Sequence, residues 1–327
     1  MTPKAVWVGK AITVALGAAV MTIALGRGTD EANLPVPARF AGALILVVSI
    51  FGIYELLGYG FGRAVARVFP QSSTSPVGLD PAPPSAHFGA GTAFAILGVY
   101  IGVQLLAFVL LAVAVNALGG HFAFDPRGTQ SASFLATGLL VGTAASAGVI
   151  VWLTWRHASD LIRVSGPLGI GLVPVSGGVV INAAATAAGF ALVVLFAAPH
   201  LAHLNSRADL GSLVQLARAG GWPRLAWAVI AVLLAPPVEE FLFRGVLFAG
   251  LARTWNEPAA GVMVTILFVA SHLPYAARYW PGTAAVSLMA VFLIALRWRT
   301  GSLVPGIAAH AAYNSVLVAA VYAAPPR

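Results

Sequence analysis

Nine long stretches of this 327-residue chain carry almost no charge, and they limit the fold more than any other feature. A helix of roughly 20 residues crosses the ~30 Å hydrocarbon core of a bilayer. Only helices and closed barrels satisfy their backbone groups there, and unbroken apolar runs favour helices. We therefore predict an all-α, polytopic transmembrane helical bundle with about eight or nine spans. The candidate spans are residues 5–26, 40–62, 89–117, 132–155, 176–198, 225–252, 258–274, 282–297 and 301–323.

The composition excludes several classes of protein. Charged residues make up 9% of the chain, whereas a soluble domain carries roughly 25%. The net charge of +8 is dispersed singly rather than gathered into a basic stripe, so we expect no nucleic-acid partner. The absence of cysteine excludes thiolate nucleophiles and Cys-based metal sites. The excess of Arg over Lys and the abundant Ala, Gly and Val favour a bacterial origin, so we expect an integral protein of the bacterial cytoplasmic membrane.

The chain divides into four regions by composition. Residues 1–69 form an N-terminal transmembrane pair, and residues 70–88 form a Pro/Ser-rich loop. Residues 89–224 form a middle transmembrane region with loops, and residues 225–323 form the C-terminal helical core. Basic residues are divided almost equally between the two sides of the membrane, so the sequence sets no orientation.

Ionisable side chains inside the predicted spans are concentrated near the C-terminus. Each costs about 2.5 to 3.5 kcal/mol to insert into a bilayer, so they are the first functional candidates. Their clustering predicts one polar site among the last four spans. The five that fall in this region are Glu239, Glu240, Arg244, His272 and His310.

The segment around Pro236 and Pro237 predicts a break in its span, because proline cannot donate a backbone hydrogen bond. We expect Pro237 to begin a new half-helix, with both glutamates in its first turn, where free amides favour carboxylates. Glu240 and Arg244 lie at i and i+4, the spacing of a helical ion pair. Glu239 points about 100° around the helix and is left unpaired, as a general base requires.

Two histidines lie on the neighbouring predicted spans. His272 follows Phe268 by four residues, and His310 precedes Asn314 by four residues, which places each pair on one helix face. A lone histidine in an apolar helix is more often a satisfied core residue. Two of them on helices beside a glutamate pair indicate a shared site.

Three motifs in this order resemble those of the CPBP family. That family comprises the type II CAAX prenyl endopeptidases and the related bacteriocin-processing and Abi membrane proteins. The resemblance covers roughly residues 225–320, under a third of the chain. The motifs are EExxxR (Glu239, Glu240, Arg244), FxxxH (Phe268, His272) and HxxxN (His310, Asn314).

The resemblance implies an intramembrane endopeptidase with its site in a helical cavity. Glu239 with His272 would activate a water molecule. His310 with Asn314 would hold the oxyanion of the tetrahedral intermediate, in agreement with their shared helix face. The structural support of the site would come from Glu240, Arg244 and Phe268.

We expect no cofactor, although zinc is an alternative. Family members have also been described as metalloproteases, and Glu239, His272 and His310 could supply three ligands with an open water position. The chain lacks the HExxH pattern that places zinc ligands and base on one helix, which favours metal-independent glutamate chemistry.

A non-enzymatic role is the competing interpretation. Broken helices with mid-membrane acids occur in inverted-repeat transporters, but residues 1–160 contain no counterpart to the Glu/His cluster. A membrane scaffold or immunity protein is the other alternative. The expected partners of the protease are the lipid bilayer and a membrane-associated protein or peptide substrate. For a bacterial protein, prenylated CAAX termini are not the expected targets, and the sequence does not set the oligomeric state.

Overall fold

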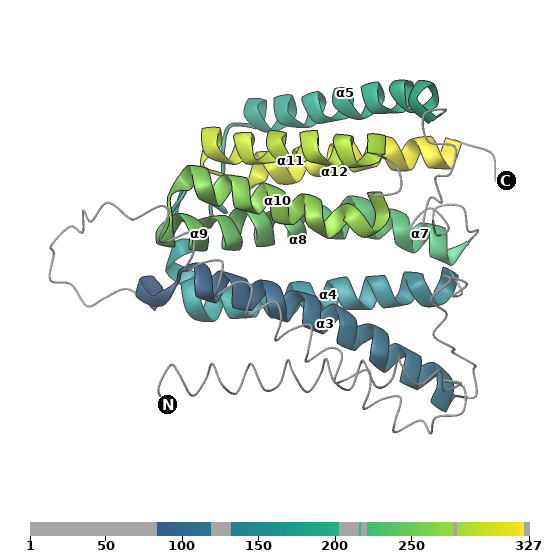
Figure 1. Ribbon diagram of the computed structural model, residues 1–327, viewed down its shortest axis with the longest axis horizontal. Helices are drawn as coiled ribbons and strands as arrows, with labels where there is room; N and C mark the ends of the chain where they lie inside the picture. The colour runs from purple at the N-terminus through teal and green to yellow at the C-terminus, as the bar shows by residue number, and fades with distance from the viewer. Residues whose placement is uncertain (1–83, 119–131, 203–215, 217–220, 277–279, 324–327) are drawn as a thin grey trace, which may run out of the picture.

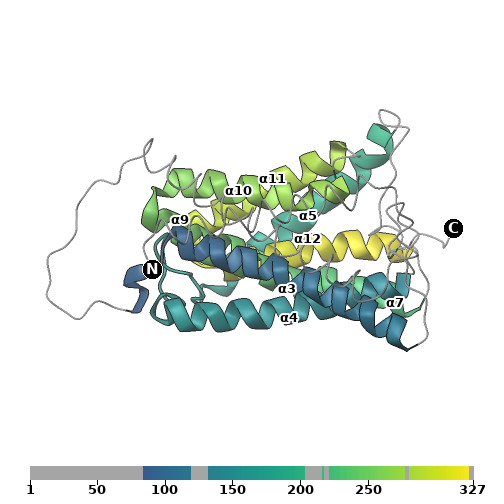
Figure 2. The same cartoon turned by 60° about the horizontal axis from the view of Figure 1, so that its bottom comes forward.

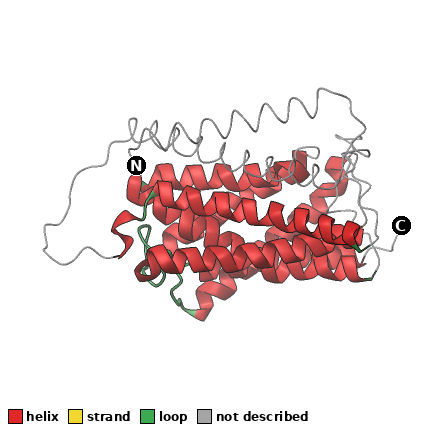
Figure 3. Cartoon of the chain, turned by 90° about the horizontal axis from the view of Figure 1, so that it is seen from below, coloured by secondary structure: helices red, strands yellow, loops and turns green. Residues whose placement is uncertain are grey.

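The computed structural model describes residues 84–118, 132–202, 216, 221–276 and 280–323. Within these ranges the regular structure is entirely helical, which confirms the all-α class (Figure 3). The predicted spans 5–26 and 40–62, and most of the Pro/Ser-rich loop, lie outside the described residues. The four predicted region boundaries stay a prediction.

Six helices in the described part of the chain are long and apolar enough to cross a membrane, which supports an integral membrane protein. The predicted count of eight or nine is not confirmed, because two of the nine candidates lie outside these residues and a third, α10 (Glu257–Ala276), has a shorter apolar stretch. The six are α3 (Ala90–Ala117), α4 (Ala132–Ala158) with the 3-10 turn η3 (Ser159–Leu161), α5 (Gly177–Ala202), the composite helix Trp222–Thr254, α11 (Trp280–Thr300) and α12 (Val304–Ala323). A short 3-10 helix, η2 (Pro84–His87), precedes α3.

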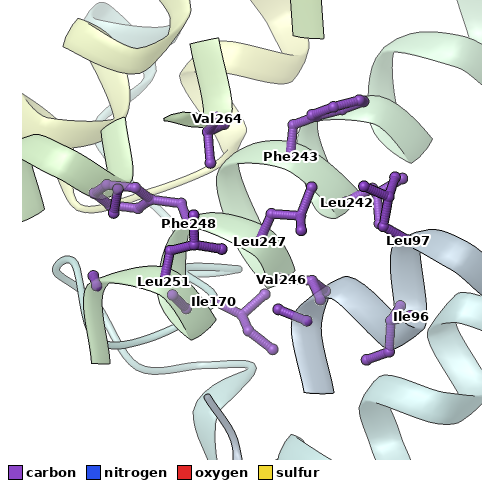
Figure 4. Close-up of a cluster of buried hydrophobic side chains, with 14 of the residues drawn as sticks. Ile96, Leu97, Ile170, Leu242, Phe243, Val246, Leu247, Phe248, Leu251 and Val264 are labelled. Carbon is purple, nitrogen blue, oxygen red and sulfur yellow. The ribbon is translucent and has the colours of Figure 1, made fainter. Parts of the chain in front are cut away.

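The composite helix runs through the middle of the bundle. In Figure 1, α5 lies beside α11 and α12 at one edge and the α3–α4 pair lies at the other, with the composite helix and α10 between them. The turned view in Figure 2 keeps α3 beside α4. One buried apolar cluster joins α3 to the composite helix and α10 (Figure 4). Its labelled members include Leu97, Leu247 and Val264.

The composite helix is continuous, and the predicted break at the prolines is wrong. One π-helical segment precedes Pro236 and Pro237, and a second one follows them. The backbone N–H of Ala235 donates to Ile230, five residues back, and the N–H of Glu240 donates to Pro236 and Pro237. A shift to wider turns thus accommodates the missing proline donors without ending the helix. The segments are α7 (Trp222–Val229), η4 (Ile230–Leu234), α8 (Ala235–Glu239), η5 (Glu240–Leu247) and α9 (Phe248–Thr254).

Both glutamates therefore lie within a helix rather than in the first turn of a new one. The carboxylates of Glu239 and Glu240 are therefore not stabilised by the free backbone amides of a helix N-terminus. Glu239 ends α8 and Glu240 begins η5, so the change from α to π turns falls between them. The partners of these carboxylates come from side chains of this helix and of α10 and α12.

Candidate active site

The site lies near the middle of the composite helix. At a rise of about 1.5 Å per residue, Glu239 is roughly 25 Å from Trp222 and roughly 22 Å from Thr254. The midpoint of a helix that crosses a membrane lies close to the centre of the hydrocarbon core. There, a polar group must find its partners within the protein.

The Glu239 carboxylate faces two imidazole rings from two other helices. Its Oε2 atom lies 4.0 Å from Nε2 of His272 on α10 and 3.9 Å from Nε2 of His310 on α12. The Oε2 atom is buried and has no hydrogen-bond partner among the described residues. These distances exceed the length of a direct hydrogen bond and are within the span that one bridging water can cover. The structure thus brings together the three residues that the sequence predicts for the reacting centre.

Hydrogen bonds define which nitrogen of each histidine carries a hydrogen. His272 Nδ1 lies 2.8 Å from the carbonyl oxygen of Phe268, and a carbonyl can only accept, so Nδ1 donates. His310 Nδ1 lies 3.1 Å from Oε1 of Glu240 and donates to that carboxylate. In the neutral rings, both Nε2 atoms are therefore acceptors that face Glu239.

Glu240 is part of a buried network of polar and charged side chains. Arg244 Nη1 donates to Oε1 of Glu240 at 3.1 Å, which is the ion pair expected from their i, i+4 spacing. Both side chains are 1% exposed. Arg244 Nη2 also donates to the carbonyl of Ala290 on α11 at 3.3 Å. Sequence reasoning missed the hydrogen bond from His310 to Glu240, which joins residues 70 positions apart and has no local signal.

The Phe268 ring contacts the side chains of Arg244, His272 and His310. The Arg244 guanidinium lies 4.1 Å from the centre of its ring, a cation–π contact. The His272 ring lies 4.5 Å from the same ring, and the His310 ring meets it edge-on at 5.9 Å. These contacts restrict the orientation of both imidazoles.

Asn314 hydrogen-bonds to the backbone of the composite helix. Its Nδ2 donates to the carbonyl of Ala231 in η4 at 2.7 Å. That carbonyl lacks a helical donor, because the N–H of Ala235 serves Ile230 and Pro236 has none. One amide hydrogen of Asn314 is therefore used structurally, and the second is left for other partners.

Gly306 allows the close approach of α12 to Glu240, and sequence reasoning missed it. A Cβ atom at this glycine would lie 3.1 Å from Oε2 of Glu240, tighter than most real Cβ contacts. Gly306 lies one turn before His310 on the same helix. Its spacing from His310 is a signal, because i and i+4 residues share a helix face.

The zinc alternative fits by donor type but less well by spacing. Each histidine gives its Nδ1 hydrogen to an acceptor and turns Nε2 to a common centre, as zinc-bound histidines do. Tetrahedral zinc with bonds of about 2.0 to 2.2 Å separates its ligand atoms by roughly 3.3 to 3.5 Å. The separations from Glu239 Oε2 are 4.0 and 3.9 Å. No group of three His, Cys, Asp or Glu in the described ranges is arranged closely enough to hold a metal ion.

Comparison with known protein families gives a match over the last third of the chain. Residues 220–316 match the family described as "Type II CAAX prenyl endopeptidase Rce1-like". No curated protein and no solved structure matches the chain. The matched segment contains all three motifs, so the resemblance to CAAX-type proteases is confirmed for this region. Because the family is one of proteases, the match supports peptidase activity in general.

Proposed function

We propose that the chain is an intramembrane endopeptidase, because residues 220–316 match the family described as "Type II CAAX prenyl endopeptidase Rce1-like". It hydrolyses a peptide bond of a membrane-associated protein or peptide within the bundle. One observation carries this proposal: the unpartnered Oε2 of Glu239 lies between two imidazole nitrogens at 4.0 and 3.9 Å. A scaffold would gain nothing from a buried carboxylate oxygen without a hydrogen-bond partner.

Glu239 acts as the general base in this mechanism. A water molecule between Glu239 and His272 gives its proton to the carboxylate while its oxygen attacks the carbonyl carbon of the peptide. His272 Nε2 accepts the second hydrogen of that water and orients it. When the tetrahedral intermediate collapses, the carbon–nitrogen bond breaks and Glu239 returns the proton to the leaving amine.

His310 and Asn314 stabilise the negative oxygen of the intermediate. His310 donates from Nε2 only as an imidazolium, because its Nδ1 hydrogen is committed to Glu240. Glu240, which Arg244 holds by its own hydrogen bond, fixes the orientation of the His310 ring. Asn314 contributes the amide hydrogen that Ala231 does not use.

Replacement of the base is the direct test. Glu239→Gln keeps the size of the side chain but cannot take a proton, so turnover of a cleavable membrane peptide is expected to fall by roughly 100-fold or more. The unfolding temperature in detergent is expected to stay close to that of the wild type. The substrate is found by comparing the membrane proteomes of cells that express the wild type and the Glu239→Gln variant.

Glu257→Gln provides the matched control, since Glu257 is an exposed glutamate at the start of α10. Its turnover is expected to equal that of the wild type. Turnover above about 10% in the Glu239→Gln variant contradicts the role of the base, because a positioned base contributes about 100-fold. A scaffold or immunity protein would instead produce identical proteomes in both strains.

The chemistry proposed here needs no metal. If zinc were used, Glu239, His272 and His310 would hold it, and it would supply an acidified water. We expect EDTA and phenanthroline to leave turnover unchanged, and elemental analysis to find well under one zinc per chain. Stoichiometric zinc whose removal stops turnover would reverse this assignment.

A further inference from the structure

The segment between η3 and α5, residues 162–176, places several backbone carbonyl groups around one arginine, and we call this segment the cradle. Arg297, near the end of α11, donates from Nη2 to the carbonyls of Gly166 and Gly169 at 2.9 and 2.6 Å. The glycine at position 171 has φ +82°, and a Cβ there would lie 2.7 Å from the guanidinium carbon. This residue must therefore lack a side chain for the cradle to close.

Arg297 also reaches the helix that carries the glutamates. Its Nε donates to the carbonyl of Arg244 at 3.1 Å. Arg297 is 2% exposed, and no carboxylate in the described residues lies within ion-pair distance of it. A buried charge without a counter-ion is costly, so the three carbonyl contacts must offset its loss of water.

The cradle segment holds the start of α12 as well. The N–H of Leu303 donates to the carbonyl of Gly171 at 2.8 Å, and Ser302 Oγ donates to Val173 at 2.6 Å. Ile170 is fully buried and lies among the side chains of the composite helix (Figure 4). A Cβ at Gly245 would lie 3.0 Å from Ile170, so this segment packs directly on η5.

These contacts connect η5 with α12, and the distance between these two helices sets the geometry of the site. Arg244 neutralises Glu240, and Glu240 in turn binds His310, seven residues after Leu303. Through the carbonyl of Arg244 and through the cradle, Arg297 fixes η5 relative to the start of α12. We propose that Arg297 is a positioning residue for the proposed peptidase reaction, setting the distance between the Glu239–Glu240 segment and His310.

This inference rests on the proposed function, so its test combines kinetics with a measurement that needs no substrate. Lysine at this position keeps the charge but cannot reach three separate carbonyls, and methionine removes all the donors. We expect kcat to fall about 10-fold in Arg297→Lys and roughly 100-fold in Arg297→Met, with KM within a factor of three. Arg299→Met is the matched control, because Arg299 is exposed on the same last turn of α11, and we expect it to keep wild-type kinetics.

Gly171→Ala is the second variant, which displaces the guanidinium without removing it and is expected to lower kcat in the same way. It decides the question together with Arg297→Lys if Arg297→Met does not fold. A wild-type kcat in both, or a rise in KM alone, overturns the proposal.

Hydrogen–deuterium exchange of the detergent-purified chain supplies the readout independent of substrate. In Arg297→Lys we expect faster exchange in residues 161–173 and 240–247, with unchanged exchange in α3. Unchanged exchange in both segments overturns the positioning role, whether or not a peptide substrate exists. If exchange changes as expected but the wild type cleaves nothing, the proposed function fails and the structural coupling stands.

Discussion

The two faces of α12 meet their neighbours by different physical means. One face carries His310 and Asn314, which hydrogen-bond to Glu240 and to the carbonyl of Ala231 on the composite helix. An adjacent face packs on α5 through small and aromatic side chains, including a stacked Phe190–Tyr313 pair with ring centres 5.6 Å apart. The α5 side of this contact is built on Ala183, Ala187 and Ala191, at four-residue spacing.

The difference shows how one helix can carry a reaction site and still be held in place. Helices in a bilayer gain little from burying apolar surface against each other, so close van der Waals contact between small residues supports the α5 face. The composite-helix face depends on particular donors and acceptors, each of which leaves a buried partner unsatisfied when it is removed. Substitutions on the two faces should therefore separate loss of activity from loss of packing.

The largest loss of stability is expected from Glu240→Gln on the polar face. The amide removes the carboxylate charge that pairs with the fully buried Arg244 guanidinium. Breaking a buried ion pair costs on the order of 3 to 5 kcal/mol, so the variant should unfold at much lower temperature or fail to accumulate. Thermal unfolding in detergent checks this, and an unfolding temperature equal to that of the wild type would remove the ion pair from the explanation.

Asn314→Ala is expected to have an intermediate effect on stability and a large effect on rate. The loss of its bond to the Ala231 carbonyl should cost about 1 to 3 kcal/mol. Loss of the oxyanion donor should lower kcat by roughly 100- to 1,000-fold with little change in KM. Calorimetry and steady-state kinetics on one peptide measure the two effects separately.

Ser315→Ala is the control for Asn314, because Ser315 is exposed and its hydroxyl donates only within α12, to Ala311. It should match the wild type in both measurements. A stability loss in Asn314→Ala with unchanged kcat would show that Asn314 supports the helix and does not hold the oxyanion. A large rise in KM would assign it to substrate binding.

The smallest effect is expected on the apolar face. Ala187→Gly removes one methyl group from the contact with α12 and loosens the helix, which should cost about 0.5 to 1 kcal/mol. The kcat of the variant should stay within a factor of two of the wild type. A tenfold fall in kcat would show that the two faces of α12 are coupled.

Local spacing in the sequence predicts part of the site and leaves its long-range contacts hidden. The i, i+4 rule correctly pairs Glu240 with Arg244 and leaves Glu239 free, because both outcomes depend on one helix. The bonds from His310 to Glu240 and from Asn314 to Ala231 join residues 70 and 83 positions apart. Nothing in either local stretch specifies such a pairing.

The prolines show a second limit of sequence reasoning. Their missing donors are correctly identified, but a break is only one solution to that deficit. The chain instead widens its turns and supplies a donor from Asn314 on another helix. The cradle residues carry no local signal of their role, because the arginine that binds their carbonyls lies more than 120 positions away.

The length of the composite helix has a consequence for the surrounding lipid. Its 33 residues extend roughly 50 Å at about 1.5 Å per residue, well beyond the ~30 Å of hydrocarbon. The excess must tilt or project into the headgroup layers at both ends. Thicker or thinner lipid would then alter how much of each end is immersed, while the carboxylates near the midpoint keep nearly the same depth.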